Sequence, residues 1–134
     1  MAVWGIGAYY KDTNPRNKEN DFIRNGYAYI GWGKNEAPSV HKMFDSVKVG
    51  DIIYIKSFVP RTKSLKIKAI GIVTDNEKQV STLGTGIQVK WKSSFNPITV
   101  VLAPEEYKNN VFNNTLYEEF DKGIIELLID ELLK

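Results

Sequence analysis

The chain lacks the residues on which many common site chemistries depend. It contains no cysteine, and His41 is its one histidine. The absence of cysteine excludes disulfides, thiolate metal sites and a cysteine nucleophile, and a single histidine argues against a zinc site. His41 stands beside Lys42 in a short helical segment, where we expect it to be exposed. The sequence therefore predicts neither a metal nor a cofactor.

Long apolar runs are missing as well. No stretch of the sequence approaches the roughly 20 apolar residues that a membrane-spanning helix needs. Residues 1–8 also lack the basic and apolar regions of a signal peptide. Because the lack of cysteine fits a reducing compartment, these features together predict a cytoplasmic protein that does not engage a membrane.

Motifs of common enzyme classes do not occur either. The sequence has no phosphate-binding loop, no serine-nucleophile elbow and no zinc-protease motif. The segment GTGIQ, which starts at Gly84, lacks the lysine of a phosphate loop. Asp51 and Asp75 adjoin a turn and a strand end, where capping of the turn explains an aspartate. We predict that the protein is not an enzyme.

Apolar and aromatic residues are plentiful enough to build a core. The 134 residues are 43% hydrophobic and 12% aromatic, which is too apolar for a disordered chain. The length is that of a single domain over residues 1–134. The formal net charge of +2 does not select a class of partner, so the distribution of charge matters more than its sum.

Alternating apolar and aromatic residues predict the strands. We expect strands at residues 3–10, 27–32, 52–58, 65–73, 87–92 and 98–102. The third and fourth are joined by a short polar loop and form an antiparallel hairpin, and the third is apolar on both faces, as in the centre of a sheet. Gly71 predicts a bulge, a barrel corner or the close approach of another backbone. The polar segments 11–20 and 76–86 are expected to be loops.

Two helices are expected, and residues 21–26 are expected to form a turn or a single helical turn. Ser39 is a suitable N-cap for a short helix over residues 40–47. Leu116, Phe120 and Ile124 open a helical repeat that predicts a helix over residues 116–133. Its wide apolar face fits either a core contact or a dimer seam. These elements predict an α+β fold, a small mixed β-barrel of five or six strands with a short inserted helix and a C-terminal helix.

Four segments in a fixed order resemble the PUA-like superfamily. They are GYAYIGWG, VGDIIYIKS, IKAIGIVTD and IQVKWK, and the resemblance covers about residues 3–92. The closest resemblance is to EVE and EVE-like domains, which include the N-terminal modules of McrB-type restriction systems and are related to YTH domains. It implies a PUA-like β-barrel that binds nucleic acid, often by admitting one modified or flipped-out base into an aromatic-lined pocket. It also suggests a setting in restriction or antiviral defence, with a protein partner from such a system. No GTPase, helicase or nuclease accompanies these segments, so a reader, a part of a toxin or defence operon, and a decoy all stay open as roles.

Trp32, which lies between Gly31 and Gly33, is the central candidate for that pocket. A base taken out of a duplex must regain its lost stacking, and aromatic faces supply about 1–3 kcal/mol per base. The alternative is that Trp32 fills the core. Trp4 and Tyr29 are candidates for pocket walls, although a core position is favoured for Trp4. The expected base-binding residues are Trp4, Tyr29, Trp32, Asn35, Ser57 and Phe58.

Basic residues gather in and beside the predicted hairpin. Their positions are Lys56, Arg61, Lys63, Lys66, Lys68, Lys90 and Lys92. They fit a phosphate-binding surface, whose affinity would fall as salt is added. They also fit an ordinary solvated edge, since edge strands carry lysine to prevent aggregation.

The sequence thus predicts a module that reads a modified base in nucleic acid, with DNA favoured over RNA. One alternative is a domain that binds a free nucleotide or another planar small molecule in the same pocket. Another is a protein-interaction module that forms a homodimer through the C-terminal helix.

Overall fold

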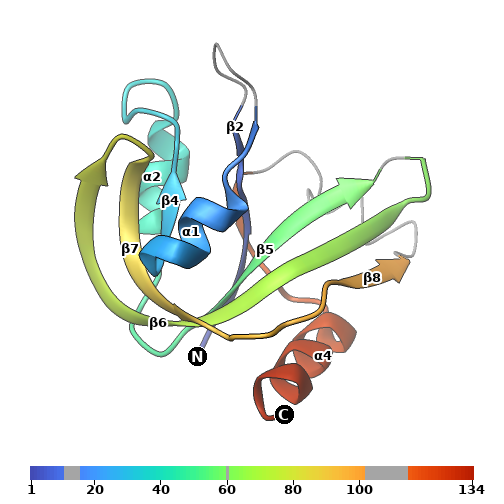
Figure 1. The fold of residues 1–134 in the computed structure, drawn as a ribbon. Helices are drawn as coiled ribbons and strands as arrows, with labels where there is room; N and C mark the ends of the chain where they lie inside the picture. Colours follow the sequence, from blue (N-terminus) through green and yellow to red (C-terminus); the bar gives the residue numbers. More distant parts are fainter. Residues whose placement is uncertain (11–15, 60, 102–114) are drawn as a thin grey trace.

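A computed structural model describes residues 1–10, 16–59, 61–101 and 115–134 of the chain (Figure 1). Its main element is a sheet that contains seven of the strands in these ranges and curls into a half-barrel (Figure 1). β8 pairs with the first part of β6, and the other six strands follow the order β4-β7-β6-β5-β1-β9. The bounds are β1 (Val3–Gly7), β4 (Tyr27–Ile30), β5 (Ile52–Val59), β6 (Ser64–Ser81), β7 (Gly84–Trp91), β8 (Ile98–Val101) and β9 (Leu116–Glu118).

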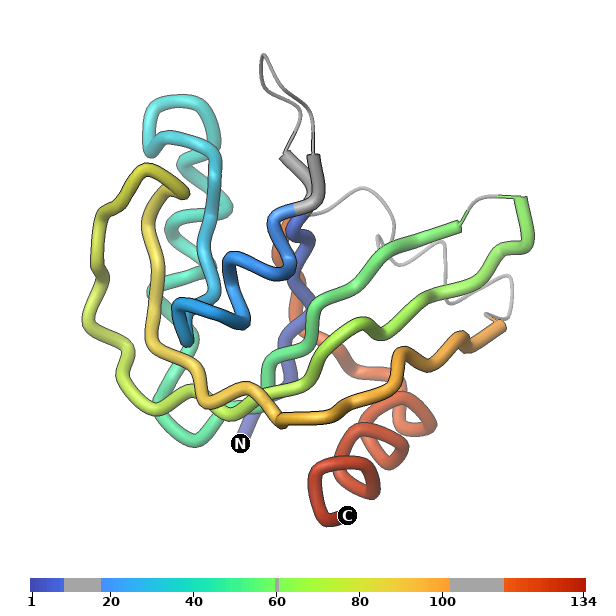
Figure 2. The backbone as a smooth tube through the Cα atoms, viewed as in Figure 1, coloured from blue at the N-terminus to red at the C-terminus, as the bar shows by residue number. Residues whose placement is uncertain are grey.

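The sheet is mixed, because β1 runs parallel to β5 and the other pairs are antiparallel. Figure 2 shows the backbones of β1 and β9 side by side, although they lie near opposite ends of the sequence. A separate two-stranded ribbon is formed by β2 (Tyr9–Tyr10) and β3 (Arg16–Asn17). The α+β barrel-like fold predicted from the sequence is confirmed.

The helices in the described ranges are α1 (Glu19–Asn25), α2 (Pro38–Phe44) and α4 (Lys122–Leu132). α1 lies within the curl of the sheet, and α4 lies outside it (Figure 1). Neither these helices nor any other helix of the described residues combines the length and the apolar character that crossing a membrane requires.

The core has two parts, one on each face of the sheet. Alternate residues of β5 supply them: Ile53 and Ile55 belong to the cluster that also holds Phe22 of α1, and Ile52 and Tyr54 belong to the cluster that holds Leu128 of α4. We call the first face inner and the second outer. Because side chains alternate along a strand, β5 is buried on both faces, as its sequence predicts.

Gly71 allows β7 to approach β6 closely where the two strands pair. A Cβ added at Gly71 would lie 2.5 Å from Val89 Cγ1 and 2.8 Å from the carbonyl oxygen of Lys90. The prediction of a close backbone approach at this position is therefore confirmed.

Asp51 ties the start of β1 to the start of β5. Its carboxylate accepts hydrogen bonds from the amides of Ala2 (3.0 Å) and Lys48 (2.9 Å) and from Trp4 Nε1 (2.9 Å). Burial favours the neutral acid, but these three donors outweigh it and hold the pKa of Asp51 below its ordinary value. The capping role predicted for Asp51 is confirmed, and it extends to the indole of Trp4.

The sequence prediction for residues 116–133 was wrong at its start. Leu116–Glu118 forms strand β9, with Leu116 in the inner cluster and Tyr117 in the outer one. The helix begins only after Asp121, whose side chain accepts a hydrogen bond from the amide of Ile124 (2.9 Å). The helical spacing of Leu116 and Ile124 therefore joins residues of two different elements.

The loop predicted at residues 76–86 is also wrong. β6 continues to Ser81 and β7 begins at Gly84, so only two residues connect the strands. The segment reads as a loop because its side chains are mostly exposed and therefore polar. Two register shifts, between Val73 and Asp75 and between Asp75 and Gln79, bend this part of β6.

Several boundaries differ from the prediction. The expected strand at residues 3–10 divides into β1 and β2, and residues 11–20 include β3 and the start of α1. Residue 102 and residues 11–15 lie outside the described ranges. α1 replaces the expected turn and ends at Gly26 in a left-handed conformation (φ 72°). α2 begins at Pro38 after Ala37, so Ser39 is inside the helix and is not its cap.

Candidate functional site

Trp32 is the member of the predicted pocket with a large aromatic surface open to solvent. It follows β4 and Gly31, and 48% of its surface is exposed. Its Nε1 donates a hydrogen bond to Thr115 Oγ1 (3.1 Å), and its carbonyl oxygen accepts one from His41 Nε2 (2.6 Å). The indole ring is thus accessible to solvent, while hydrogen bonds hold both the edge of the ring and the backbone of the residue.

These contacts join the two ends of the strand order. β4 ends just before Trp32, and β9 begins just after Thr115. The carbonyl oxygen of Thr115 in turn accepts a hydrogen bond from the amide of Gly7 (2.8 Å), at the end of β1. We call Trp32, His41 and Thr115 the seam site, because they bridge the two edges of the curled sheet.

His41 was predicted to be exposed, and this is wrong. Only 8% of its surface is exposed. Its ring reaches back from α2 to the Trp32 carbonyl, which has left the sheet and needs a donor. His41 is therefore a positioning residue of the seam site, which the sequence pattern of α2 did not reveal.

The loop after Trp32 is short and well braced. The amide of Gly33 donates to Glu36 Oε1 (2.9 Å), and the carbonyl of Gly33 accepts from the amides of Glu36 and Ala37. Asn35 is exposed in this turn, as is Lys34. Asn35 thus lies in the same loop as Trp32.

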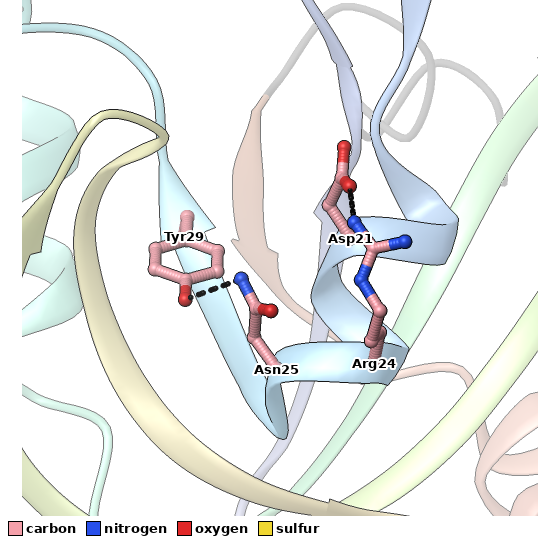
Figure 3. Close-up of polar contacts among 4 residues, drawn as sticks. All are labelled: Asp21, Arg24, Asn25 and Tyr29. Carbon is pink, nitrogen blue, oxygen red and sulfur yellow. Dashed lines mark hydrogen bonds and ion pairs between the residues drawn. The ribbon is translucent and has the colours of Figure 1, made fainter.

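Trp4 and Tyr29 are parts of the inner core and not of an open wall. Trp4 is buried with its Nε1 bonded to Asp51. Tyr29 stacks on Tyr27 at 5.7 Å between ring centroids and packs edge-on against Phe22. Its hydroxyl accepts a hydrogen bond from Asn25 Nδ2 (3.2 Å), next to the ion pair of Asp21 and Arg24 in α1 (Figure 3).

Ser57 and Phe58 are neighbours on β5 that face opposite sides of the sheet. Both are half-buried, and Phe58 packs against the outer core cluster. Ser57 is paired with Lys66 of β6, on the inner face. The structure therefore does not bring the six predicted pocket residues together. Trp32 belongs to the seam site, and Asn35 lies in the adjoining loop.

The predicted phosphate-binding residues are divided between the two faces. Lys66 is exposed on the inner face, and Lys68 forms an ion pair with Glu19 of α1 (3.8 Å). Lys90 pairs with Ile72, and Lys92 Nζ donates to the carbonyl oxygen of Lys134 at the end of α4 (3.1 Å), which places these two on the outer face. Arg61 and Lys63 are exposed in the hairpin turn. Lys56 lies on the outer face among aromatic residues, so the seven do not form one surface.

A buried polar cluster on the outer face was not predicted. The hydroxyl of Tyr54 lies 2.5 Å from that of Tyr117 and donates to Glu119 Oε1 (2.5 Å). Glu119 Oε2 accepts from the amide of Asp121, the residue that caps α4 (3.1 Å). Burial raises the pKa of Glu119 despite these hydrogen bonds. To predict this cluster from the sequence, β5 and β9 must be recognised as strands that lie close together. The helix wrongly predicted from residue 116 prevented this, because it includes the residues of β9.

The fold and the seam site define a small α+β barrel-like domain with an anchored, exposed tryptophan at the junction of its edge strands. No family model and no curated protein matches the chain. Among the described residues, no group of three or more histidine, aspartate and glutamate side chains is placed to hold a metal ion.

Proposed function

We propose that the chain is a cytoplasmic nucleic-acid-binding module that stacks one base against the exposed indole of Trp32. The observation that supports this proposal most strongly is that the ring is exposed although hydrogen bonds hold both its Nε1 and the carbonyl oxygen of the same residue. A ring held in place before binding loses little conformational entropy when a base stacks on it. Gly31 and Gly33 carry no side chains, so the two sequence neighbours of Trp32 do not cover the ring.

Positive charge near the seam site supports contacts with the backbone of a nucleic acid. Lys34 in the adjoining loop and Lys42 in α2, next to His41, are both exposed. Because such contacts release counterions, affinity should decrease as the salt concentration rises.

The choice of a modified or flipped-out base, and of DNA over RNA, rests on the resemblance of the four sequence segments to EVE-like domains. So does the setting in restriction or antiviral defence with a protein partner. The faces of an unstacked base are free to contact an aromatic side chain. A single exposed indole can stack on one of these faces.

The test is a titration with oligonucleotides that contain or lack methylated or hydroxymethylated bases, at two salt concentrations. We expect Trp32→Ala to weaken binding by about 1–3 kcal/mol, the value of one stacked base. Trp32→Phe should retain much of the affinity. Phe120→Ala is the matched control, because Phe120 is exposed (76%) but lies in the link between β9 and α4.

Unchanged affinity of the Trp32→Ala variant for every oligonucleotide would contradict the proposal. Binding of a free nucleoside that depends on Trp32 but not on salt would instead identify a domain for planar small molecules. Loss of binding in the Phe120→Ala variant alone would move the site to the link between β9 and α4.

A further inference from the structure

Asn25 and Gly26 form the only Asn-Gly pair of the sequence, and the pair lies where α1 ends and the chain turns into β4. An asparagine side chain is open to attack by the backbone nitrogen of the next residue. Glycine favours this reaction because it has no side chain to hinder the approach. Asn25 is exposed. The junction of α1 and β4 therefore carries a reactive pair that lies outside the seam site.

The attacking group, the backbone nitrogen of Gly26, is held by α1. Its N–H donates to the carbonyl oxygens of Phe22 (3.0 Å) and Ile23 (3.3 Å), and the left-handed conformation of Gly26 ends the helix. The carbonyl oxygen of Gly26 accepts a hydrogen bond from the amide of Val89 in β7 (2.9 Å). Gly26 is thus fixed to the helix on one side and to the sheet on the other.

The group that is attacked, the side-chain amide of Asn25, is held as well. Its Nδ2 donates to the hydroxyl of Tyr29 (3.2 Å), and Figure 3 shows the amide pointing to that hydroxyl. Tyr29 is itself buried in the inner core. Reaction requires the Gly26 nitrogen to lose its proton and to reach Asn25 Cγ, so the hydrogen bonds of both groups must first break.

We propose that Asn25 is a site of spontaneous deamidation and that the last turn of α1 controls the reaction. When the turn opens, the Gly26 nitrogen gives its proton to solvent and forms a bond to Asn25 Cγ. The bond between Cγ and Nδ2 breaks, and Nδ2 takes a proton from solvent and leaves as ammonia. Water then opens the cyclic imide at either of its carbonyl carbons, which yields aspartate or isoaspartate. The reaction needs no oxidant or reductant, and it is independent of the function proposed for the seam site.

Either product weakens the attachment of α1 to the sheet. Both place a negative charge at the C-terminal end of the helix, where the helix dipole is also negative, and Asp21 lies one turn earlier. Isoaspartate in addition inserts a methylene into the main chain before Gly26. The hydrogen bonds of Gly26 to Phe22 and to Val89 then no longer fit the same chain path. Deamidation should therefore release the end of α1 from the start of β4.

The experiment incubates the native protein, and the protein in guanidinium chloride, at neutral pH and measures deamidation by peptide mass spectrometry after digestion at acidic pH. In denaturant, Asn25 should react faster than Asn35 and Asn76, which are exposed but precede glutamate. In the native protein Asn25 should react at least about tenfold more slowly than in denaturant, because only molecules with an open turn react. Hydrogen exchange of the Gly26 amide measures the same opening, since both reactions begin with loss of the same proton. The slowing of deamidation should follow the protection of this amide.

Two glycine substitutions separate opening of α1 from unfolding of the whole protein. Ile23 in α1 and Met43 in α2 are exposed to a similar extent (41% and 38%) and lie in helices of equal length. Ile23→Gly lowers the helix propensity of the last turn of α1, so deamidation of the native protein should become at least about twofold faster. Met43→Gly weakens α2 in the same way and is the matched control, which should leave the rate unchanged. Neither substitution alters the Asn-Gly pair, so the rates in denaturant should be equal.

Deamidation of Asn25 as fast in the native protein as in denaturant would overturn the proposal. So would equal acceleration by Ile23→Gly and Met43→Gly, because the reaction would then depend on global unfolding. A rate in denaturant no higher than that of Asn35 and Asn76 would show that Asn25 is not a preferred site. If either glycine variant fails to fold, the comparison of Gly26 exchange with deamidation in the unaltered protein still decides the question.

Discussion

Gly5 and Gly7 lie on the same face of β1 but in different surroundings. A Cβ at Gly5 would lie 2.5 Å from Cζ and 2.6 Å from the hydroxyl oxygen of Tyr117, whereas at Gly7 the nearest atoms are 3.9 Å away. Gly5 pairs with both Tyr54 and Tyr117, so the absence of its side chain makes room for the rings that form the buried polar cluster. One glycine is required by its neighbours, and the other is not.

We therefore expect opposite effects from alanine at these two positions. Gly5→Ala should displace Tyr117 and lower the free energy of unfolding by about 1–3 kcal/mol, as overpacking in a core does. Gly7→Ala should be neutral or stabilise by up to about 1 kcal/mol, because glycine is unfavourable inside a strand. Urea denaturation of both variants tests this, and equal stability of the two would show that Tyr117 does not pack as described.

Whole elements show which parts of the fold can be predicted from sequence. The hairpin of β5 and β6 was predictable because the apolar run of β5, the alternation at the start of β6 and the polar turn between them are local signals. The start of α4 was not, because the spacing of Leu116, Phe120 and Ile124 matches a helix, whereas the pairing of β9 with β1 depends on residues far away in the sequence. The same limit applies to the candidate site: the glycine-flanked Trp32 could be identified, but its contacts with His41 and Thr115 require the folded chain.

The sequence left open whether the apolar face of α4 is a core contact or a dimer seam, and in the structure part of that face packs on the outer cluster. Leu128 is fully buried in the outer cluster, and Leu133 is 81% exposed. Leu128→Ala should lower the free energy of unfolding by about 2–5 kcal/mol, and Leu133→Ala should change it little. Thermal denaturation at several protein concentrations provides the measurement. A melting temperature of the unaltered protein that rises with concentration would favour the dimer seam instead.

Stability as a function of pH is a property of the whole molecule, and two buried carboxylates affect it in opposite directions. The pKa of Asp51 lies below its ordinary value of 3.8 in the folded state, because the three hydrogen bonds outweigh burial. Burial raises the pKa of Glu119 above 4.5. Asp51 therefore contributes stability that is lost as the pH falls below about 4, and the contribution of Glu119 is lost as the pH rises above 4.5 through its folded-state pKa.

We expect these two groups to place a maximum of stability on the acidic side of neutrality. Asp51→Asn should flatten the decline of the unfolding free energy below pH 4, and Glu119→Gln should flatten the decline that begins above pH 4.5. Chemical denaturation at pH steps from 3 to 7 measures both slopes. Retention of the acid-side slope in Asp51→Asn would mean that the Asp51 hydrogen bonds do not control it.

The position of β1 between β5 and β9 has a consequence for synthesis of the chain. Val3 pairs with Ile52, and Gly5 pairs with Tyr117, so β1 emerges from the ribosome long before either of its partners. Pairings over such long sequence separations form slowly, and the unpaired strand is open to aggregation until they do. The nascent chain must therefore carry the apolar segment VWGIG without its sheet, and it acquires complete pairing of that strand only when residues 116–118 have been added.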